Sequence, residues 1–352
     1  MDLVTVAQNL GLGLKRSTVD LHPYSPKWAK AYQLFSQTIS SLSKQSIQIE
    51  HVGSTALPGS FAKPILDLLL IYEDHQFFHQ ELLPALLQLG FTAKGEMGIA
   101  GREFFTFYDK AQEIDHVHIH AFIRGHEHIN RLIVFRDHLL SDEAVKQAYS
   151  AFKQRLKTNN TPRKSYPSAK DDFVQRILQQ EASHLLHIEI ADKTHLALFE
   201  PKDYENLFAA VDADRAHLTV FLPWVKETKT AADHLPFIER AWQQYLRDDG
   251  WQAKIIYDGK LIGSAGFHGI DWQERTSTIG YWLASAFCGQ GIMTQTVAAL
   301  IRHAFNVWQL ASVTIKCEKA NRASRAIALR LGFHEESTSD DKYFLYTKYR
   351  SS

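Results

Sequence analysis

One stretch decides the expected fold: Ile279-Gly280-Tyr281-Trp282-Leu283, followed by Cys288-Gly289-Gln290-Gly291-Ile292-Met293-Thr294. The first run is typical of the end of a β-strand, and the second is typical of a glycine-rich turn that opens a helix. Apolar residues that fall on one face support this helix, namely Val297, Leu300, Ile301, Ala304 and Phe305.

The start of such a helix is suited to binding an anion. Its first N–H groups have no partners within the helix and carry a partial positive charge. Gly289 and Gly291 let the backbone approach a diphosphate closely, so that no lysine is required. Two glycines before a helix also form ordinary tight turns, and the rest of the sequence must separate the two interpretations.

Length and composition predict two globular domains. The chain has 352 residues, and a single hydrophobic core rarely grows beyond ~250–300 residues. Hydrophobic residues make up 45% and charged residues 22%, which is enough apolar material for two cores. Lysine plus arginine equals aspartate plus glutamate, at 39 each, so no general binding to nucleic acid or to an acidic membrane surface is expected.

The sequence also predicts a cytoplasmic protein. The two cysteines, Cys288 and Cys317, are too few for a disulfide-stapled secreted fold, and free thiols are expected. The N-terminus shows no basic and apolar signal sequence. The longest strongly apolar stretch, 65–72, is interrupted by Asp67 and is far shorter than the ~20 residues of a membrane span. The sequence does not indicate an oligomeric state.

Two domains are predicted at 1–184 and 185–352. The polar stretch 157–164 is typical of a long loop, but it does not mark the boundary. The segment after it, 170–182, is expected to be a helix that closes the first domain, because apolar residues recur at helical spacing, namely Phe173, Ile177 and Leu178.

Helices and strands alternate in both halves, which predicts a mixed α/β (α+β) fold. In the first half, helices are expected at 26–42 and 127–140, and strands at 47–51, 65–72 and 116–123. In the second half, helices are expected at 293–308 and 324–331, and strands at 188–190, 196–198, 252–257, 261–268, 276–283, 312–317 and 342–348. Asp258-Gly259 is typical of a tight hairpin turn.

The second half resembles the GNAT superfamily of N-acetyltransferases, most closely its RimL-like branch, which acetylates ribosomal-protein N-termini and related amines. The resemblance covers about residues 187–349, and its motifs are specific in order and spacing. The matching residues are Leu222-Pro223-Trp224, Ile262-Gly263, Ile279 to Leu283, Gly289 to Thr294, Asn321, Ser324 and Leu331-Gly332-Phe333. The resemblance implies a GNAT acyl-CoA N-acyltransferase fold with a mixed sheet, and acetyl-CoA as the acetyl donor.

The resemblance also implies roles for individual residues. It implies that turn amides hold the coenzyme A pyrophosphate and that the backbone of one strand pairs with the pantetheine arm. The expected cofactor-binding residues are Tyr281, Trp282, Leu283, Cys288, Gly289, Gln290, Gly291, Ile292, Met293, Thr294 and Asn321. Ser324 is the expected proton donor to the departing thiolate, with Asn321 near the cofactor, and Trp224 is expected to line the acceptor cleft. Asn321 can also cap a helix, and Trp224 can be an ordinary packing residue.

Two positions depart from the family pattern. Cys288 stands where the family usually has glutamine or arginine, and its simplest interpretation is a small buried residue. Thr278 stands where the RimL-like pattern usually has a glutamate. Direct transfer requires a neutral amine. Deprotonation at pH 7 costs about 4.6 kcal/mol for a lysine side chain of pKa ~10.4, but only about 1 kcal/mol for an α-amine near ~7.8.

The missing carboxylate therefore favours an acceptor of low pKa, either a protein N-terminal α-amine or a small amine. His268 and Glu274 could act as bases through water. His268 is preferred as a catalytic residue because imidazole titrates near neutral pH. It could equally be a histidine at a strand end that faces solvent.

The first half resembles the GrpB-like family, which is related in fold to nucleotidyltransferases and has no firmly assigned activity. The resemblance covers about residues 19–182 and implies a nucleotidyltransferase-like fold. The matching residues are His51-Val52-Gly53-Ser54-Thr55-Ala56-Leu57-Pro58-Gly59, Ala62-Lys63-Pro64-Ile65-Leu66-Asp67, His118-Ile119-His120, Phe135-Arg136-Asp137, Tyr149, Lys153, Tyr166 and Lys170.

A ligand site is expected in this half at Gly53, Ser54, Thr55, Lys63, Asp67, His118 and His120. Gly53-Ser54 fits a triphosphate-binding turn and Asp67 a metal-binding carboxylate, but Leu69 replaces the usual second carboxylate. His116, His118 and His120 alternate, which places all three on one strand face. They could bind a divalent metal such as Zn²⁺ or Mn²⁺ together with Asp67, or they could form a polar strand surface.

Three functions remain open from the sequence. The first is an amine N-acetyltransferase with an accessory domain that binds a nucleotide or phosphate ligand, and Asn321 and Ser324 favour it. The second is a non-catalytic acetyl-CoA sensor, which the loss of glutamate at Thr278 favours. The third is a nucleotidyltransferase that acts on small amines, and Leu69 argues against it. The first is our prediction, and the sequence does not identify the amine.

Overall fold

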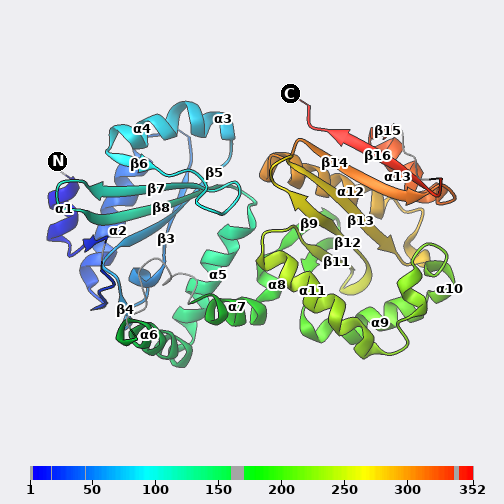
Figure 1. The fold of residues 1–352 in the computed structure, drawn as a ribbon, viewed down its shortest axis with the longest axis horizontal. Coiled ribbons are helices and arrows are strands. Elements are labelled where there is room, and N and C mark those ends of the chain that lie inside the picture. The colour runs from blue at the N-terminus through cyan, green and yellow to red at the C-terminus, as the bar shows by residue number, and fades with distance from the viewer. Residues whose placement is uncertain (1–2, 17, 44, 160–169, 337–340, 352) are drawn as a thin grey trace. The chain divides into compact units, whose positions relative to one another are not determined.

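The computed structural model describes residues 3–16, 18–43, 45–159, 170–336 and 341–351. The chain forms two compact units, Met1–Leu178 and Gln179–Ser352 (Figure 1). Tyr166 and most of the polar stretch 157–164 lie outside the described residues.

The first unit is built on a six-stranded sheet in the order β3-β5-β8-β7-β6, with β1 beside β8. β5 and β8 run parallel and the other pairs are antiparallel, while β2 and β4 form a separate two-stranded sheet. The strands are β1 (Leu14–Lys15), β2 (His22–Pro23), β3 (Gln48–Val52), β4 (Phe61–Ala62), β5 (Leu66–Tyr72), β6 (Phe91–Ala93), β7 (Glu103–Asp109) and β8 (Ile114–Ile123). The helices are α1 (Leu3–Asn9), α2 (Pro26–Ser40), α3 (His75–Phe77), α4 (Leu83–Gln88), α5 (Glu127–Ser141), α6 (Glu143–Thr158) and α7 (Asp171–Gln180).

Helices α2 and α5 cover opposite faces of the six-stranded sheet. Phe35 of α2 contacts Phe107 of β7, with ring centroids 6.1 Å apart. On the other face, Ile129 of α5 packs in a cluster with Leu69 of β5. Asp67 lies on the same face as Leu69, because alternate residues of a strand point the same way. The polar end of this face, around Asp67, keeps part of its side-chain surface exposed.

The second unit is built on an eight-stranded sheet in the order β15-β16-β14-β13-β12-β11-β10-β9. β13 and β14 run parallel, and all other neighbours are antiparallel. The strands are β9 (His187–Ala191), β10 (Thr194–Leu198), β11 (Gln252–Tyr257), β12 (Lys260–Asp271), β13 (Thr276–Leu283), β14 (Ser312–Glu318), β15 (His334–Glu336) and β16 (Tyr343–Tyr349). The helices are α8 (Ala182–Leu185), α9 (Tyr204–Asp212), α10 (Arg215–Leu218), α11 (Leu235–Leu246), α12 (Ile292–Arg302) and α13 (Arg322–Arg330).

The two faces of this sheet are covered by different helices. On one face, Trp282 of β13 packs against a buried cluster that includes Leu207 of α9 and Ile238 of α11. On the other face, Phe267 of β12 contacts Trp308 just after α12, with ring centroids 4.7 Å apart. The sheet therefore separates a layer formed by α9 and α11 from a layer that contains α12.

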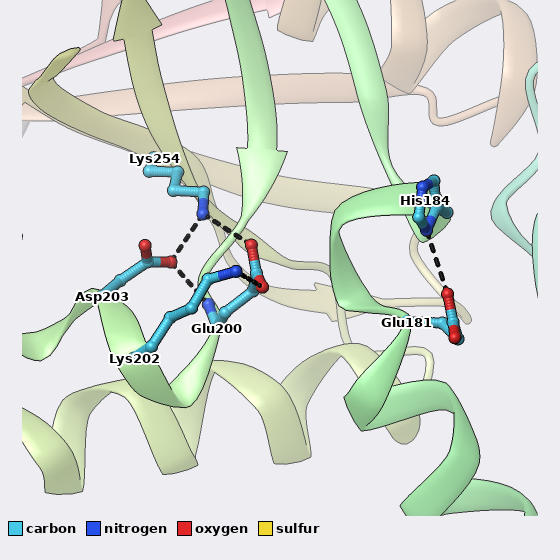
Figure 2. A network of polar contacts seen from close by, with 6 residues as sticks. All are labelled: Glu181, His184, Glu200, Lys202, Asp203 and Lys254. Atoms are coloured by element: carbon cyan, nitrogen blue, oxygen red, sulfur yellow. Dashed lines mark hydrogen bonds and ion pairs between the residues drawn. The ribbon is translucent and has the colours of Figure 1, made fainter. Parts of the chain in front are cut away.

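A buried ion network ties the central sheet to the start of α9 (Figure 2). The Lys254 Nζ of β11 lies 2.6 Å from Asp203 Oδ2 and 3.2 Å from Glu200 Oε1. Asp203 also accepts a hydrogen bond from the Glu200 backbone N–H at 2.7 Å, which caps the turn before α9. Lys202 adds an ion pair to Glu200 at 2.8 Å. These contacts fix the position of the helical layer that packs on Trp282.

The mixed α/β class predicted from the sequence is confirmed in both units. The hairpin turn at Asp258-Gly259 is also confirmed: both residues have positive φ, +48° and +77°, and Tyr257 pairs with Lys260. The helix predicted at 293–308 is α12 followed by a π-helical turn at His303–Val307. Within the described residues, no helix is long and apolar enough to cross a membrane.

Candidate active site

Strands β13 and β14 pair over only part of their length. Their parallel ladder contains Thr276–Thr278 opposite Ser312–Thr314, yet β13 continues to Leu283 and β14 to Glu318. On its other side β13 remains paired with β12 up to Leu283. The backbone N–H and C=O groups of residues 279–283 that point toward β14 therefore have no ladder partner there, and an extended ligand could use them.

Thr278 closes the paired end of this opening. Its Oγ1 lies 2.8 Å from Thr314 Oγ1 at the last rung of the ladder. Thr314 also donates to the Ser277 carbonyl oxygen at 3.4 Å. The position where the sequence lacks the expected glutamate thus holds a hydroxyl pair that joins the two strands, and it supplies no base.

Tyr281 and Ser324 meet on the α12 side of the sheet. Tyr281 Oη lies 2.7 Å from Ser324 Oγ, which belongs to the first turn of α13. Burial raises the pKa of Tyr281 to about 12, although the Ser324 contact acts in the opposite direction. Asn321 caps the same helix, because its Oδ1 accepts a hydrogen bond from the Ser324 N–H at 3.0 Å. Asn321 therefore holds the helix end that carries Ser324.

The turn before α12 has the geometry of an anion site. Gly289 and Gly291 have φ of +77° and +81°, which only glycine adopts easily. The first intrahelical bond runs from the Gln295 N–H to the Gly291 carbonyl at 3.0 Å, so the N–H groups of residues 292–294 have no acceptor within the helix. Arg330 donates to Thr294 Oγ1 at 2.8 Å and brings a positive charge to this turn.

Other residues of the turn serve to shape it. Gln290 Nε2 donates back to the Ala286 carbonyl at 3.0 Å. The Ser285 N–H and Oγ donate to Asp214 at 2.6 and 2.7 Å. Cys288 is exposed, so its interpretation as a small buried residue is wrong. Partial burial and the nearby Asp214 raise the pKa of its thiol.

His268 of β12 and the tryptophans Trp224 and Trp282 lie on the opposite face of the sheet. A Cβ placed on Gly280 would lie 1.9 Å from His268 Nε2, so the imidazole ring lies directly over the Gly280 backbone. His268 is exposed, as the alternative of a solvent-facing histidine expected, but partial desolvation of its imidazole lowers its pKa. Trp224 stands edge-on to Trp282 with ring centroids 6.5 Å apart. Glu274 lies in the β12–β13 turn, where its N–H donates to Asp271 at 2.9 Å.

His268 also lines a pocket of about 510 Å³ against α11. Gly269 also lines it, and the other lining residues are polar, namely Arg240, Gln243, Gln244, Arg247 and Asp249. The pocket and the tryptophans lie on the same face of β13, and Ser324 lies on the other face. The opening between β13 and β14 is the place where groups from both faces can reach one ligand.

In the first unit, Asp67, His118 and His120 form a polar cluster on β5 and β8. Asp67 Oδ1 lies 3.4 Å from His118 Nδ1 and 3.7 Å from His120 Nε2, and the three side chains keep 29%, 21% and 19% of their surface exposed. Burial acts to raise the pKa of Asp67, but the two histidines hold it well below its usual value. The cluster is open to solvent and carries a charged carboxylate at neutral pH.

The turn after β3 packs directly on this carboxylate. A Cβ on Gly53 would lie 2.5 Å from Asp67 Oδ2, and Gly53 has φ of +70°. Thr55 is buried, and its Oγ1 lies 3.0 Å from His51 Nε2. Burial lowers the pKa of His51 to about 4. Ser54 and Lys63 lie in the segment that follows β3, and both are half-buried.

The expectation that His116, His118 and His120 share one strand face is wrong, so the possible metal site that combines all three with Asp67 does not form. A bulge between Phe107 and Tyr108 shifts the β7–β8 register next to His116, so strict alternation fails there. His116 is fully buried, and its Nδ1 lies 3.1 Å from the Leu12 carbonyl instead of joining Asp67. Among the described residues, no group of three or more His, Cys, Asp or Glu side chains is arranged to hold a metal ion.

Comparison with known proteins gives one match for each unit. The model of the family described as GrpB protein matches residues 18–180, and that of the acetyltransferase (GNAT) domain matches residues 193–334. YdaF of Bacillus subtilis, named for an inferred ribosomal N-acetyltransferase activity, is 34% identical over 151 residues, which cover 43% of this chain and 82% of YdaF. A UPF0157 protein of Halalkalibacterium halodurans is 30% identical over 167 residues, which cover 47% of this chain and 83% of the relative.

The chain belongs to the GrpB family through its first half and to the GNAT acetyltransferases through its second. Among solved structures, the microcin C7 self-immunity acetyltransferase MccE, in complex with acetyl-CoA and AMP, is 25% identical with a TM-score of 0.45, and the match covers 48% of this chain and 99% of MccE. The enzyme class predicted from the sequence, an N-acetyltransferase, is confirmed.

The GNAT unit also contains contributors that sequence reasoning missed. Arg330 at the anion turn, Asp214 beneath Ser285 and Thr314 beside Thr278 come from segments distant from their partners. Of these three residues, Arg330 alone has a local feature that could have drawn attention to it: it is a basic residue in the last turn of α13, just before Gly332. The free state predicted for both cysteines is confirmed.

Proposed function

We propose that the chain transfers acetyl from acetyl-CoA to an amine of low pKa by direct attack of the amine on the thioester. The acceptor is a peptide or protein α-amine, or a small amine. The observation that carries the proposal is the divergence of β13 and β14 beside the glycine turn, with the Tyr281–Ser324 pair at its edge. The name of YdaF, which refers to ribosomal N-acetylation, supports a peptide acceptor.

The residues present fit the donor. The unpartnered N–H groups at the start of α12, together with Arg330, offer hydrogen bonds and positive charge to a pyrophosphate. A Cβ on Gly289 would meet no atom within 4 Å, so this side of the turn is open. The free backbone of residues 281–283 offers a ladder edge to the amide-bearing pantetheine arm. Ser324 is the proton donor to the departing thiol.

The acceptor side has a histidine but no carboxylate at the expected position. Thr278 is occupied by its bond to Thr314, and His268 is the titratable side chain that lies over Gly280. Because its pKa is lowered, His268 is neutral at pH 7 and can accept a proton from an attacking amine. Trp224 and Trp282 form an aromatic wall on this face.

The acceptor is tested by measuring thiol release from acetyl-CoA with matched peptides. One peptide has a free α-amine and no lysine, and the other has a blocked N-terminus and one lysine. We expect the α-amine peptide to be preferred by at least about tenfold at pH 7, because its deprotonation costs less. Preference for the lysine peptide would reject the low-pKa assignment. Thr278→Glu should raise the rate with the lysine peptide, and Thr278→Gln, of similar size without a base, should not.

For the GrpB unit we propose a site that binds a nucleotide or phosphate ligand without turning it over. The partly exposed cluster at Asp67, His118 and His120 beneath the Gly53 turn supports a ligand site. Leu69, the position of the usual second carboxylate, is buried in the core, which disfavours nucleotidyl transfer. Calorimetric titration with nucleotides should show binding that is lost in His118→Ala. Release of pyrophosphate from ATP would contradict the proposal.

A further inference from the structure

Three side chains from three different elements meet where β13 and β14 diverge. Tyr281 projects from β13, Cys317 from β14 and Ser324 from α13, and Tyr281 Oη lies 2.7 Å from Ser324 Oγ. Burial raises the pKa of the Cys317 thiol, and Ser324 acts in the opposite direction. Ser324 thus lies between a phenol on one strand and a thiol on the other.

Ser324 alone is a poor source for the proton that a departing thiolate needs. An aliphatic hydroxyl is a much weaker acid than a thiol, so its proton transfer would leave an alkoxide inside the protein. Ser324 is only 8% exposed, and a buried charge without a partner is costly. The transfer is much less unfavourable if a stronger acid than serine reprotonates the serine in the same step. The Tyr281 phenol is at hydrogen-bond distance, and it is fully protonated at neutral pH.

We propose that Tyr281 supplies the proton that Ser324 passes to the departing thiol, so that two hydroxyl protons move together during acetyl transfer. This inference rests on the proposed acetyltransferase function. In the step, the bond between the amine nitrogen and the acetyl carbon forms and the carbon–sulfur bond breaks. The sulfur takes the proton of Ser324 Oγ, and Ser324 takes the proton of Tyr281 Oη. The proton lost by the amine passes to His268 and from there to water, and water reprotonates the tyrosinate before the next turnover.

Tyr281 acts through Ser324 and is therefore a positioning residue, and the test must separate proton supply from simple support of the serine. The readout is the proton inventory, the dependence of kcat on the deuterium fraction of the solvent under conditions where chemistry limits the rate. For the wild-type full-length chain with an α-amine peptide, we expect a curved inventory that reports two protons in flight. A linear inventory in the wild type would overturn the inference without any variant.

Variants make the test independent of the wild-type measurement. Tyr281→Phe should lower kcat by about 10- to 100-fold, leave the KM for acetyl-CoA within about twofold, and give a linear inventory. The double variant Tyr281→Phe with Ser324→Ala should have a kcat only slightly below that of Ser324→Ala alone, because loss of the serine already interrupts the proton transfer from Tyr281. Independent, multiplicative losses would overturn the inference.

Tyr346→Phe is the matched control. Tyr346 is also buried, and its hydroxyl donates a hydrogen bond to Glu335 at 3.0 Å. It lies on β16, and its hydroxyl accepts a hydrogen bond from Arg325 at 3.3 Å, so it contacts α13 next to Ser324 but through a different side chain. We expect a kcat within about twofold of wild type and a curved inventory, since a lost tyrosine hydrogen bond usually costs only about 1 kcal/mol of stability. A wild-type chain that acetylates no amine would reject both the proposed function and this inference. An active chain whose Tyr281→Phe variant keeps full kcat would reject the inference alone.

Discussion

At the scale of single residues, His268 and Gly280 are complementary. The imidazole occupies the space that any side chain at position 280 would need, since a Cβ there would lie 1.9 Å from Nε2. Strand alternation predicts that both positions share a face, but not that they touch. The close approach holds the ring against the free backbone of β13, where an attacking amine would lose its proton.

The pH dependence of the reaction tests this role. Partial desolvation lowers the pKa of His268 below its usual 6.5, so the base form persists into mildly acidic solution. We expect kcat/KM with an α-amine peptide to have an acid limb centred below pH 6.5. In His268→Gln this limb should disappear and the neutral rate should fall by roughly 10²-fold. An unchanged profile in the variant would assign the base to another group or to water.

At the scale of elements, the turn before α12 depends on left-handed glycines. Gly289 and Gly259 form a matched pair, because both have φ of +77° and neither would place a Cβ within 4 Å of another atom. Each Gly→Ala change should cost about 1–2 kcal/mol of stability. Only Gly289→Ala should raise the KM for acetyl-CoA, by roughly 5- to 30-fold if the turn relaxes by that energy. Equal KM values for acetyl-CoA in both variants would show that the turn before α12 does not bind the donor.

The ion network at the start of α9 makes a prediction about stability. Lys254 is the cation between Glu200 and Asp203, whose side chains are only 13% and 7% exposed (Figure 2). Lys254→Met should lower the free energy of unfolding by about 3–5 kcal/mol, because it leaves Asp203 buried without its cation and leaves Glu200 with Lys202 alone. Lys342→Met breaks a surface pair between an exposed lysine and the partly buried Glu318, and it should destabilise the protein far less than Lys254→Met does.

Acid should reduce the difference between wild type and Lys254→Met. Burial acts to raise the pKa of Glu200, but Lys202 and Lys254 hold it below the usual 4.5. A lowered pKa contributes stability that is complete above the unfolded value and is lost as the pH falls through the folded value. In the variant, which lacks the Lys254 cation, the two carboxylates can protonate at a higher pH than in the wild type. Urea denaturation at pH 7 and pH 4 should show that the variant loses more unfolding free energy, relative to wild type, at pH 7 than at pH 4. An equal loss at both pH values would mean that lost packing, and not lost charge pairing, destabilises the variant.

At the scale of the whole molecule, the two units have separate cores, which predicts independent sites. Asp67→Asn in the full-length chain should remove the charged partner of His118 and His120 and weaken ligand binding to the GrpB unit. We expect kcat and the KM for acetyl-CoA to stay within about twofold of wild type, as measured by thiol release. A larger change would show coupling between the units and would favour the sensor hypothesis.

Local patterns were sufficient for much of the fold and for part of the site. The period of Val297, Leu300 and Ile301 predicted α12, because backbone geometry alone decides which residues share a helical face. Alternation fails at His116, because His116 is itself the extra residue of a bulge in β8 and no local signal marks it. Cys288 was placed in the core by its size and type, although a turn held by Asp214 exposes it.

The sequence by itself determined the two families, the glycine turn before α12 and the absence of a carboxylate at Thr278. These features are local, since they depend on residue type and on spacing within one element. Only the tertiary structure decided that Thr278 bonds to Thr314, that β13 and β14 separate beyond it, and that Tyr281 meets Ser324 across 43 residues of sequence. Such contacts depend on strand register and on packing between distant segments, which residue spacing does not encode.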